Sequence, residues 1–126
     1  MKLGSPKQAE NDFKEALSKY ATGGKLVECY KDEVYRIYYN RGINYYLNLK
    51  NSEEAIKSLK SAIGAPNLLN EEKSAAYNYL GLSHFELRQY TDAIKQFKKS
   101  IESSTPKMAV HFNNRGLAYY HMCLYE

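Results

Sequence analysis

The chain has 126 residues and a net charge of +4, and its composition is 44% apolar and 25% charged. This length suits a single domain over residues 1–126 with a sizeable core, and the composition is ordinary for a globular protein. No run approaches the roughly 18 apolar residues that a membrane-spanning helix needs. The first residues also lack the apolar stretch of a signal peptide, so neither a membrane protein nor a secreted one is indicated.

Apolar residues recur at helical spacing along most of the chain, beginning with the stretch 6–20. The clearest case is 92–103, where Ala93, Ile94, Phe97 and Ile101 stand at positions i, i+1, i+4 and i+8 and share one helix face. No pattern fixes the register of residues 21–34. The spacing predicts an all-α fold with helices at about 6–20, 27–49, 53–63, 71–88, 92–103 and 107–122.

An alanine motif occurs over residues 9–17 and returns at 55–63 and 93–101. In each copy, phenylalanine or leucine follows the alanine by four residues, so both lie on the apolar stripe of the helix. This stripe is expected to pack on a neighbouring helix.

A glycine motif alternates with the alanine motif, over residues 38–46, 77–85 and 112–120. Each copy places an aromatic residue four positions before its glycine and a tyrosine or histidine three positions after it. The glycines are Gly42, Gly81 and Gly116. A glycine inside a helix costs about 1 kcal/mol relative to alanine, so its use there indicates a close approach of two helices. We expect the alanine of the alanine motif to lie opposite each glycine.

Short links near residues 50–52 and 89–91 join a glycine-motif helix to the next alanine-motif helix. Each pair is therefore expected to form an antiparallel hairpin. A hairpin with an apolar stripe on both helices cannot bury the two stripes alone, whereas stacked hairpins bury them in one continuous core. The sequence predicts an α-solenoid.

The pattern resembles the tetratricopeptide repeat (TPR), whose signature is aromatic-x₂-Leu-Gly-x₂-Tyr, then Ala-x₃-Phe, then Pro. The middle repeat matches best, with Tyr77, Gly81, His84, Ala93 and Phe97 at signature positions. The resemblance implies an unpaired second helix over 6–20, a first repeat over 35–63, a second over 74–103, and the first helix of an incomplete third repeat over 107–126.

Arg41 and Arg115 occupy the same position, directly before a glycine, where the signature has leucine. One interpretation is a pair of contacts to an anionic ligand. The interpretation we favour is that each guanidinium covers the neighbouring repeat or pairs with an acid of an alanine-motif helix.

The resemblance also implies a protein–protein interaction scaffold, in which the first helices of the repeats line a concave groove that holds a peptide or helix of a partner. The alternative is that the rings on this surface only pack at helix edges. One TPR subclass clamps a peptide carboxylate with lysines, but Tyr39 and Val110 stand in their places here. The expected partner-binding residues are Arg36, Tyr39, Asn40, Tyr46, Asn78, Phe85, Asn113 and Tyr120.

No nucleophile or acid–base set is evident, so we expect no enzyme activity and no cofactor. His121 and Cys123 are close in sequence but too few for a metal site. Cys29 and Cys123 lie among apolar residues and are expected to be buried free thiols, which suits a reducing cytoplasm. The family resemblance suggests a cytoskeletal or ciliary assembly as one setting.

Other functions stay open at this point. The chain could be a regulatory TPR segment of a larger enzyme or, less favoured, a nucleic-acid adaptor that uses lysines and tyrosines. The mild positive charge slightly favours an acidic protein partner. The apolar segment 107–126 suggests a fragment of a longer TPR protein, or an end that a partner or a second copy covers head to tail.

Overall fold

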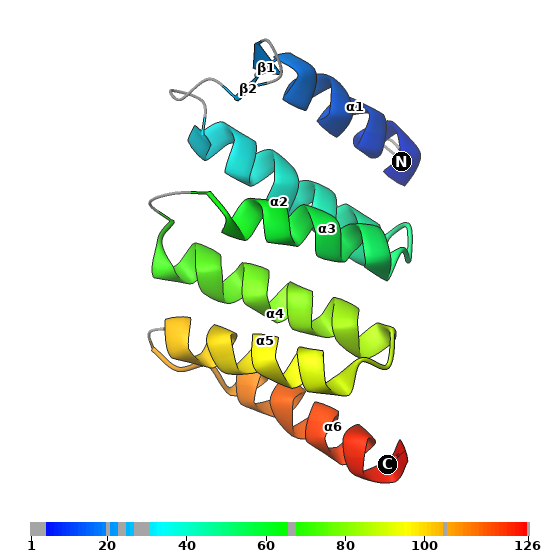
Figure 1. Cartoon of the computed structure of the whole chain (residues 1–126), viewed down its shortest axis with the longest axis vertical. Coiled ribbons are helices and arrows are strands. Elements are labelled where there is room, and N and C mark those ends of the chain that lie inside the picture. Colours follow the sequence, from blue (N-terminus) through cyan, green and yellow to red (C-terminus); the bar gives the residue numbers. More distant parts are fainter. Residues whose placement is uncertain are drawn as a thin grey trace. The chain divides into compact units, whose positions relative to one another are not determined.

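The computed structural model describes residues 5–19, 21–22, 25–26, 31–65, 68–104 and 106–125. Figure 1 shows these elements as helices with one short hairpin, so the all-α helical-repeat fold is confirmed. The elements are α1 (Pro6–Lys19), β1 (Ala21–Thr22), β2 (Lys25–Leu26), α2 (Lys31–Leu47), α3 (Ser52–Ile63), α4 (Asn70–Glu86), α5 (Tyr90–Ser103) and α6 (Ala109–Tyr125).

The helices begin and end within four residues of the expected positions, and the largest difference is at the start of α2. This helix begins at Lys31 rather than near residue 27. Upstream of it, β1 and β2 pair antiparallel, with Ala21 opposite Leu26 and Thr22 opposite Lys25. The sequence pattern had not predicted these strands, because two residues are too few to show an alternating pattern.

The chain forms two compact units, Met1–Pro66 and Asn67–Glu126. The first unit contains α1, the hairpin, α2 and α3, and the second contains α4, α5 and α6. The boundary falls in the linker between the two repeats that the sequence predicts.

The glycines of α2 and α4 mark the closest approach of the helices within each hairpin. A Cβ at Gly42 would lie 2.6 Å from Leu59 Cγ, and one at Gly81 would lie 2.5 Å from Phe97 Cε1. At both glycines the nearest side chain comes from the residue four positions after the motif alanine. The motif alanine Ala55 also faces the Gly42 position, with its backbone oxygen 3.4 Å from the added Cβ. The alanine is fully buried and lets the backbones approach, while the larger side chain covers the glycine.

The turns inside the two hairpins are built alike. Lys50 and Arg88 each stand five residues before the motif alanine, and they have positive φ angles of 52° and 61°. The next residue in each turn donates its backbone N–H back to the preceding helix: Asn51 to the oxygen of Tyr45 and Gln89 to that of His84, both at 2.9 Å. The repeat therefore extends to the backbone conformation of the turn.

Candidate functional site

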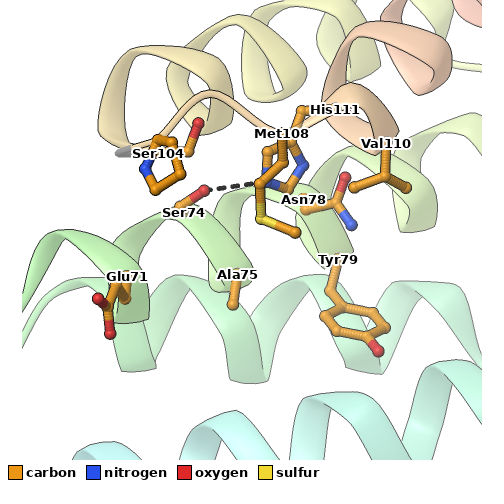
Figure 2. Close-up of a pocket in the computed structure, with 10 residues that line it drawn as sticks. Glu71, Ser74, Ala75, Asn78, Tyr79, Ser104, Met108, Val110 and His111 are labelled. Carbon is orange, nitrogen blue, oxygen red and sulfur yellow. Dashed lines mark hydrogen bonds between the residues drawn. The ribbon is translucent and has the colours of Figure 1, made fainter.

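The second unit contains an open pocket of about 500 Å³ between α4 and the start of α6 (Figure 2). Residues one turn apart on α4 form one wall, and the α5–α6 connection with the first turn of α6 forms the other. The lining residues are Glu71, Ser74, Ala75, Asn78, Tyr79, Ser104, Pro106, Met108, Val110 and His111.

A buried polar network connects the pocket wall to α5. Ser74 Oγ donates to the backbone oxygen of Ser100 at 3.0 Å, and Ser100 Oγ donates to that of Ser74 at 3.1 Å. Since the single hydroxyl proton of Ser74 is used in this way, the 3.1 Å contact between Ser74 Oγ and His111 Nε2 requires the imidazole to donate. The network therefore selects the tautomer of His111 that carries its proton on Nε2.

His111 is 5% exposed, and its Nδ1 has no hydrogen-bond partner among the residues that the structure describes. Burial lowers the pKa of His111 below its usual value, because the cationic form would lose solvation. The imidazole is thus neutral at pH 7 and serves as a polar part of the wall.

Asn78 and Asn114 connect α4 to α6 beside the pocket. Asn114 Nδ2 donates to Asn78 Oδ1 at 2.9 Å, which fixes the orientation of the Asn78 amide and leaves its Nδ2 available as a donor. The apolar rim consists of Met108 and Val110, which are 51% and 45% exposed. The site thus combines an oriented amide with accessible apolar surface.

In the second unit, the predicted site residues fall in different surroundings. Asn78 lines the pocket, whereas Asn113 and Tyr120 are exposed on α6. The ring of Phe85 packs edge-on against those of His121 at 5.0 Å and Tyr90 at 5.4 Å, which places it against the core of the unit.

In the first unit, the four predicted residues all lie on α2. Arg36 and Asn40 are exposed, and Tyr39 and Tyr46 are partly buried. The ring of Tyr39 stacks on that of Tyr35 with a centroid separation of 5.8 Å. The predicted residues are therefore divided equally between the two units.

Sequence reasoning missed most of the pocket, although one signal was present. His111 stands five residues before its glycine, where the other two repeats have Ile37 and Ala76. Likewise, Ser100 takes the position that Ala62 holds in α3. A polar residue that replaces an apolar one at the same repeat position could have indicated the buried network.

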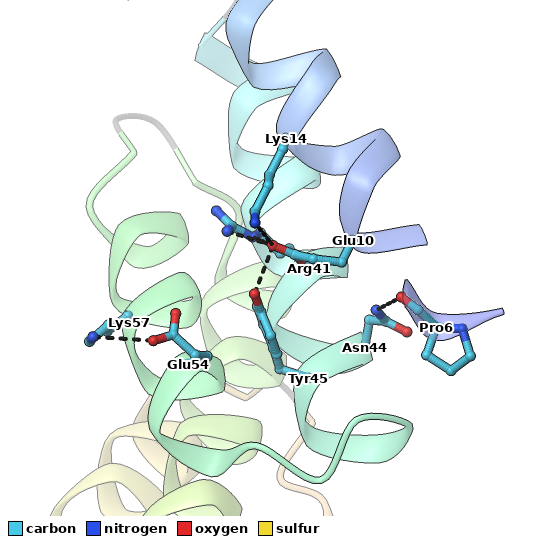
Figure 3. A network of polar contacts seen from close by, with 8 residues as sticks. All are labelled: Pro6, Glu10, Lys14, Arg41, Asn44, Tyr45, Glu54 and Lys57. Carbon is cyan, nitrogen blue, oxygen red and sulfur yellow. Dashed lines mark hydrogen bonds and ion pairs between the residues drawn. The ribbon is translucent and has the colours of Figure 1, made fainter. Parts of the chain in front are cut away.

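Arg41 binds a carboxylate of its own unit, that of Glu10 (Figure 3). Arg41 Nε donates to the two oxygens of Glu10 at 2.8 and 3.0 Å, and Nη2 lies 2.6 Å from Oε1. Tyr45 OH donates to Glu10 Oε1 at 2.7 Å. The favoured interpretation, pairing with an acid of an alanine-motif helix, is confirmed for this arginine.

The titration behaviour follows from this pairing. Burial alone would lower the pKa of Arg41, but the hydrogen bonds and charge of Glu10 raise it above the usual value. Burial and the nearby Glu10 also raise the pKa of Tyr45. Both groups therefore keep their protons throughout the neutral range.

Two further expectations concern the cysteines and membranes. Cys123 is an exposed free thiol on α6, so the prediction that it is buried is wrong; Cys29 lies outside the described residues. None of the helices in the described ranges is long and apolar enough to cross a membrane.

Comparison with known proteins gives one family. The family model for Tetratricopeptide repeat matches residues 40–109, which is 70 of the 126 residues and spans from α2 to the start of α6. No curated protein matches the sequence.

Proposed function

The chain belongs to the tetratricopeptide repeat family, whose repeats are typically non-catalytic protein-interaction modules, and we propose that its second unit binds a partner peptide in the pocket between α4 and α6. The observation that carries this proposal is an open, mainly apolar pocket with an oriented amide, Asn78, in its wall. Pockets of this kind bury an apolar group and use a few polar groups to fix its orientation.

An apolar side chain of the partner is the best occupant of the pocket. Its volume of about 500 Å³ leaves room for a large side chain between Ala75 and the rim residues Met108 and Val110. Burying such a side chain contributes roughly 1.5–3 kcal/mol. Glu71 is the one charged side chain among the described lining residues, so the pocket offers no counterion to an acidic peptide.

We expect the backbone of the partner peptide to form a hydrogen bond with Asn78. Because Asn114 occupies Asn78 Oδ1, the amide presents Nδ2 to a peptide carbonyl. The remaining predicted residues would extend the contact surface in each unit. They are Arg36, Tyr39, Asn40 and Tyr46 on α2, Phe85 on α4, and Asn113 and Tyr120 on α6.

A selection from a phage-displayed library of random linear peptides tests the proposal. Selected peptides should share an apolar anchor, and the variant Ala75→Leu, which fills the pocket, should bind them roughly tenfold more weakly or worse. Ala109→Leu is the matched control, because Ala109 is exposed and does not line the pocket. Equal loss in both variants, or none with Ala75→Leu, would rule the pocket out as the binding site.

Binding of the same peptides also distinguishes contacts in the pocket from contacts with the other predicted residues. Asn78→Ala should weaken binding, whereas Tyr39→Ala and Tyr120→Ala report whether the contact extends along α2 and α6.

A cytoplasmic setting remains part of the proposal, since an exposed free thiol at Cys123 suits a reducing compartment. A nucleic-acid adaptor gains no support from the lining, because none of the residues described there carries a positive charge at pH 7.

A further inference from the structure

One face of α6 lacks the cover that the same face of α2 and α4 has. Gly42 and Gly81 lie under Leu59 and Phe97, whereas a Cβ placed on Gly116 would meet nothing within 4 Å. The open face of α6 therefore has a notch at Gly116. It corresponds to the positions of Gly42 and Gly81, which Leu59 and Phe97 cover.

The aromatic residues that flank the notch are also accessible. Phe112 is 44% exposed and Tyr119 is 48% exposed, whereas the corresponding residues before and after Gly42 and Gly81 are partly or fully buried. These counterparts are Tyr38 and Tyr45 on α2, and Tyr77 and His84 on α4. An α-helix with a large apolar side chain at its centre is the shape that this face accommodates.

The helix α1 has such a side chain on a stripe of the alanine motif. Ala9, Phe13 and Ala16 stand where α3 has Ala55, Leu59 and Ala62, and where α5 has Ala93, Phe97 and Ser100. The residues in α3 and α5 are fully buried, but Ala9, Phe13 and Ala16 are only partly buried. The hydrogen bonds from α1 to α2 involve Glu10 and the backbone oxygen of Pro6.

We propose that α1 of a second copy of this chain packs antiparallel on α6, with Phe13 over Gly116. The contact repeats one that the protein already forms, Phe97 over Gly81, and it covers apolar surface on both helices. Because each chain carries one α1 and one α6, the association is heterologous, and further copies add in the same direction.

Sedimentation velocity over a range of concentrations, together with a mixing experiment, tests the proposal. The wild-type chain should show an average mass that rises above one chain with concentration. Phe13→Asp removes the side chain that enters the notch, and Gly116→Leu fills the notch, so each variant alone should be monomeric. An equimolar mixture should form a heterodimer, because the first variant keeps its α6 face and the second keeps its α1 stripe.

Controls separate association from folding. Asn11→Asp and Asn113→Leu change exposed positions of the same two helices and should associate like the wild type. Circular dichroism should show unchanged helicity in every variant, and Ala9→Arg replaces Phe13→Asp if that variant unfolds. A wild-type chain that is monomeric at all concentrations, or a mixture of the two variants that stays monomeric, would overturn the proposal.

The orientation gives a second readout. In an antiparallel pair, Cys123, seven residues after Gly116, lies opposite Pro6, seven residues before Phe13. In a Cys29→Ser background, Pro6→Cys should therefore be linked to Cys123 of another molecule by a short bismaleimide. A parallel or different contact would instead give a cross-link with Ser18→Cys and none with Pro6→Cys.

Discussion

The interface of α1 with α2 and that of α5 with α6 place the same arginine in different surroundings. On α2, Arg41 meets the carboxylate of Glu10, the residue after the motif alanine of α1. On α6, Arg115 has the same position, but the residue after the motif alanine of α5 is Ile94. Arg115 accordingly lies over the ring of Phe112, 5.6 Å from its centroid.

This difference shows that a repeat position does not determine the role of its residue. Both guanidinium groups lie over a ring, that of Arg41 at 5.7 Å from the centroid of Tyr45, and the facing residue on the preceding helix decides whether the guanidinium also forms a buried ion pair. A buried charge must be paired, whereas a guanidinium at a partly exposed ring gains little from its position. The two arginines should therefore respond very differently to the same substitution.

The largest effect is expected for Arg41→Leu. The substitution leaves Glu10, 7% exposed, with the 3.9 Å contact to Lys14 as its remaining ion pair among the described residues, and should lower the free energy of unfolding by about 3 kcal/mol. Arg115→Leu is the matched control and should change it by less than about 0.5 kcal/mol. Urea unfolding measures both, and equal losses would mean that the pair with Glu10 does not distinguish the two interfaces.

Gly81 on α4 and Gly116 on α6 also share a repeat position in different surroundings, so the same substitution should change stability in opposite directions. Gly81→Ala forces a Cβ against the fully buried Phe97 and should destabilise the protein by about 2 kcal/mol. Within one chain, a Cβ at Gly116 meets no atom within 4 Å, so in the monomeric Phe13→Asp background Gly116→Ala should stabilise the protein by up to about 1 kcal/mol, because alanine favours the helix. Thermal or urea unfolding of both glycine variants in that background tests this, and a loss of stability with Gly116→Ala would contradict the open face of α6.

The positions of the helices could be predicted because the apolar spacing repeats over long segments. His84, which stands at a signature position of the repeat, is buried, and its Nδ1 contacts Gln89 Oε1 at 2.7 Å. The side chain that covers each glycine could not be predicted, because spacing locates a stripe but not how far a side chain reaches across to the next helix. The exposure of Cys123 depends on which face of α6 is covered, and spacing does not reveal this.

The pocket was harder to predict than the fold. Of the predicted residues, Asn78 alone lines it, since the other wall comes from a connection and the first turn of α6 rather than from a repeat motif. Asn78 also bonds to Asn114 and not to the neighbouring Asn113, a choice that depends on the rotation of α6 about its axis. Sequence periodicity indicates which residues share a helix face but does not determine this rotation.

The second unit should depend on pH through His111, whereas the first unit has no histidine among its described residues. The folded-state pKa of His111 lies below its unfolded value because the ring is buried. Its contribution is therefore fully present above the unfolded pKa of about 6.5 and is lost as pH falls through the lower folded value. Carboxylates titrate in part of the same range, so the wild type is compared with His111→Asn. The stability difference between them should shrink on acidification, and a constant difference from pH 7.5 to 5 would contradict this.

The smallest expected effect concerns the turn of the first hairpin. Lys50 has φ 52°, a left-handed conformation that glycine adopts without a steric penalty, so Lys50→Gly should stabilise the chain by about 0.5–1 kcal/mol. Lys60→Gly, in the exposed face of α3, is the control and should cost about 1 kcal/mol, because glycine disfavours the helix interior. Urea unfolding that shows a loss for both glycines would mean that the lysine at position 50 stabilises the turn by contacts that outweigh its backbone conformation.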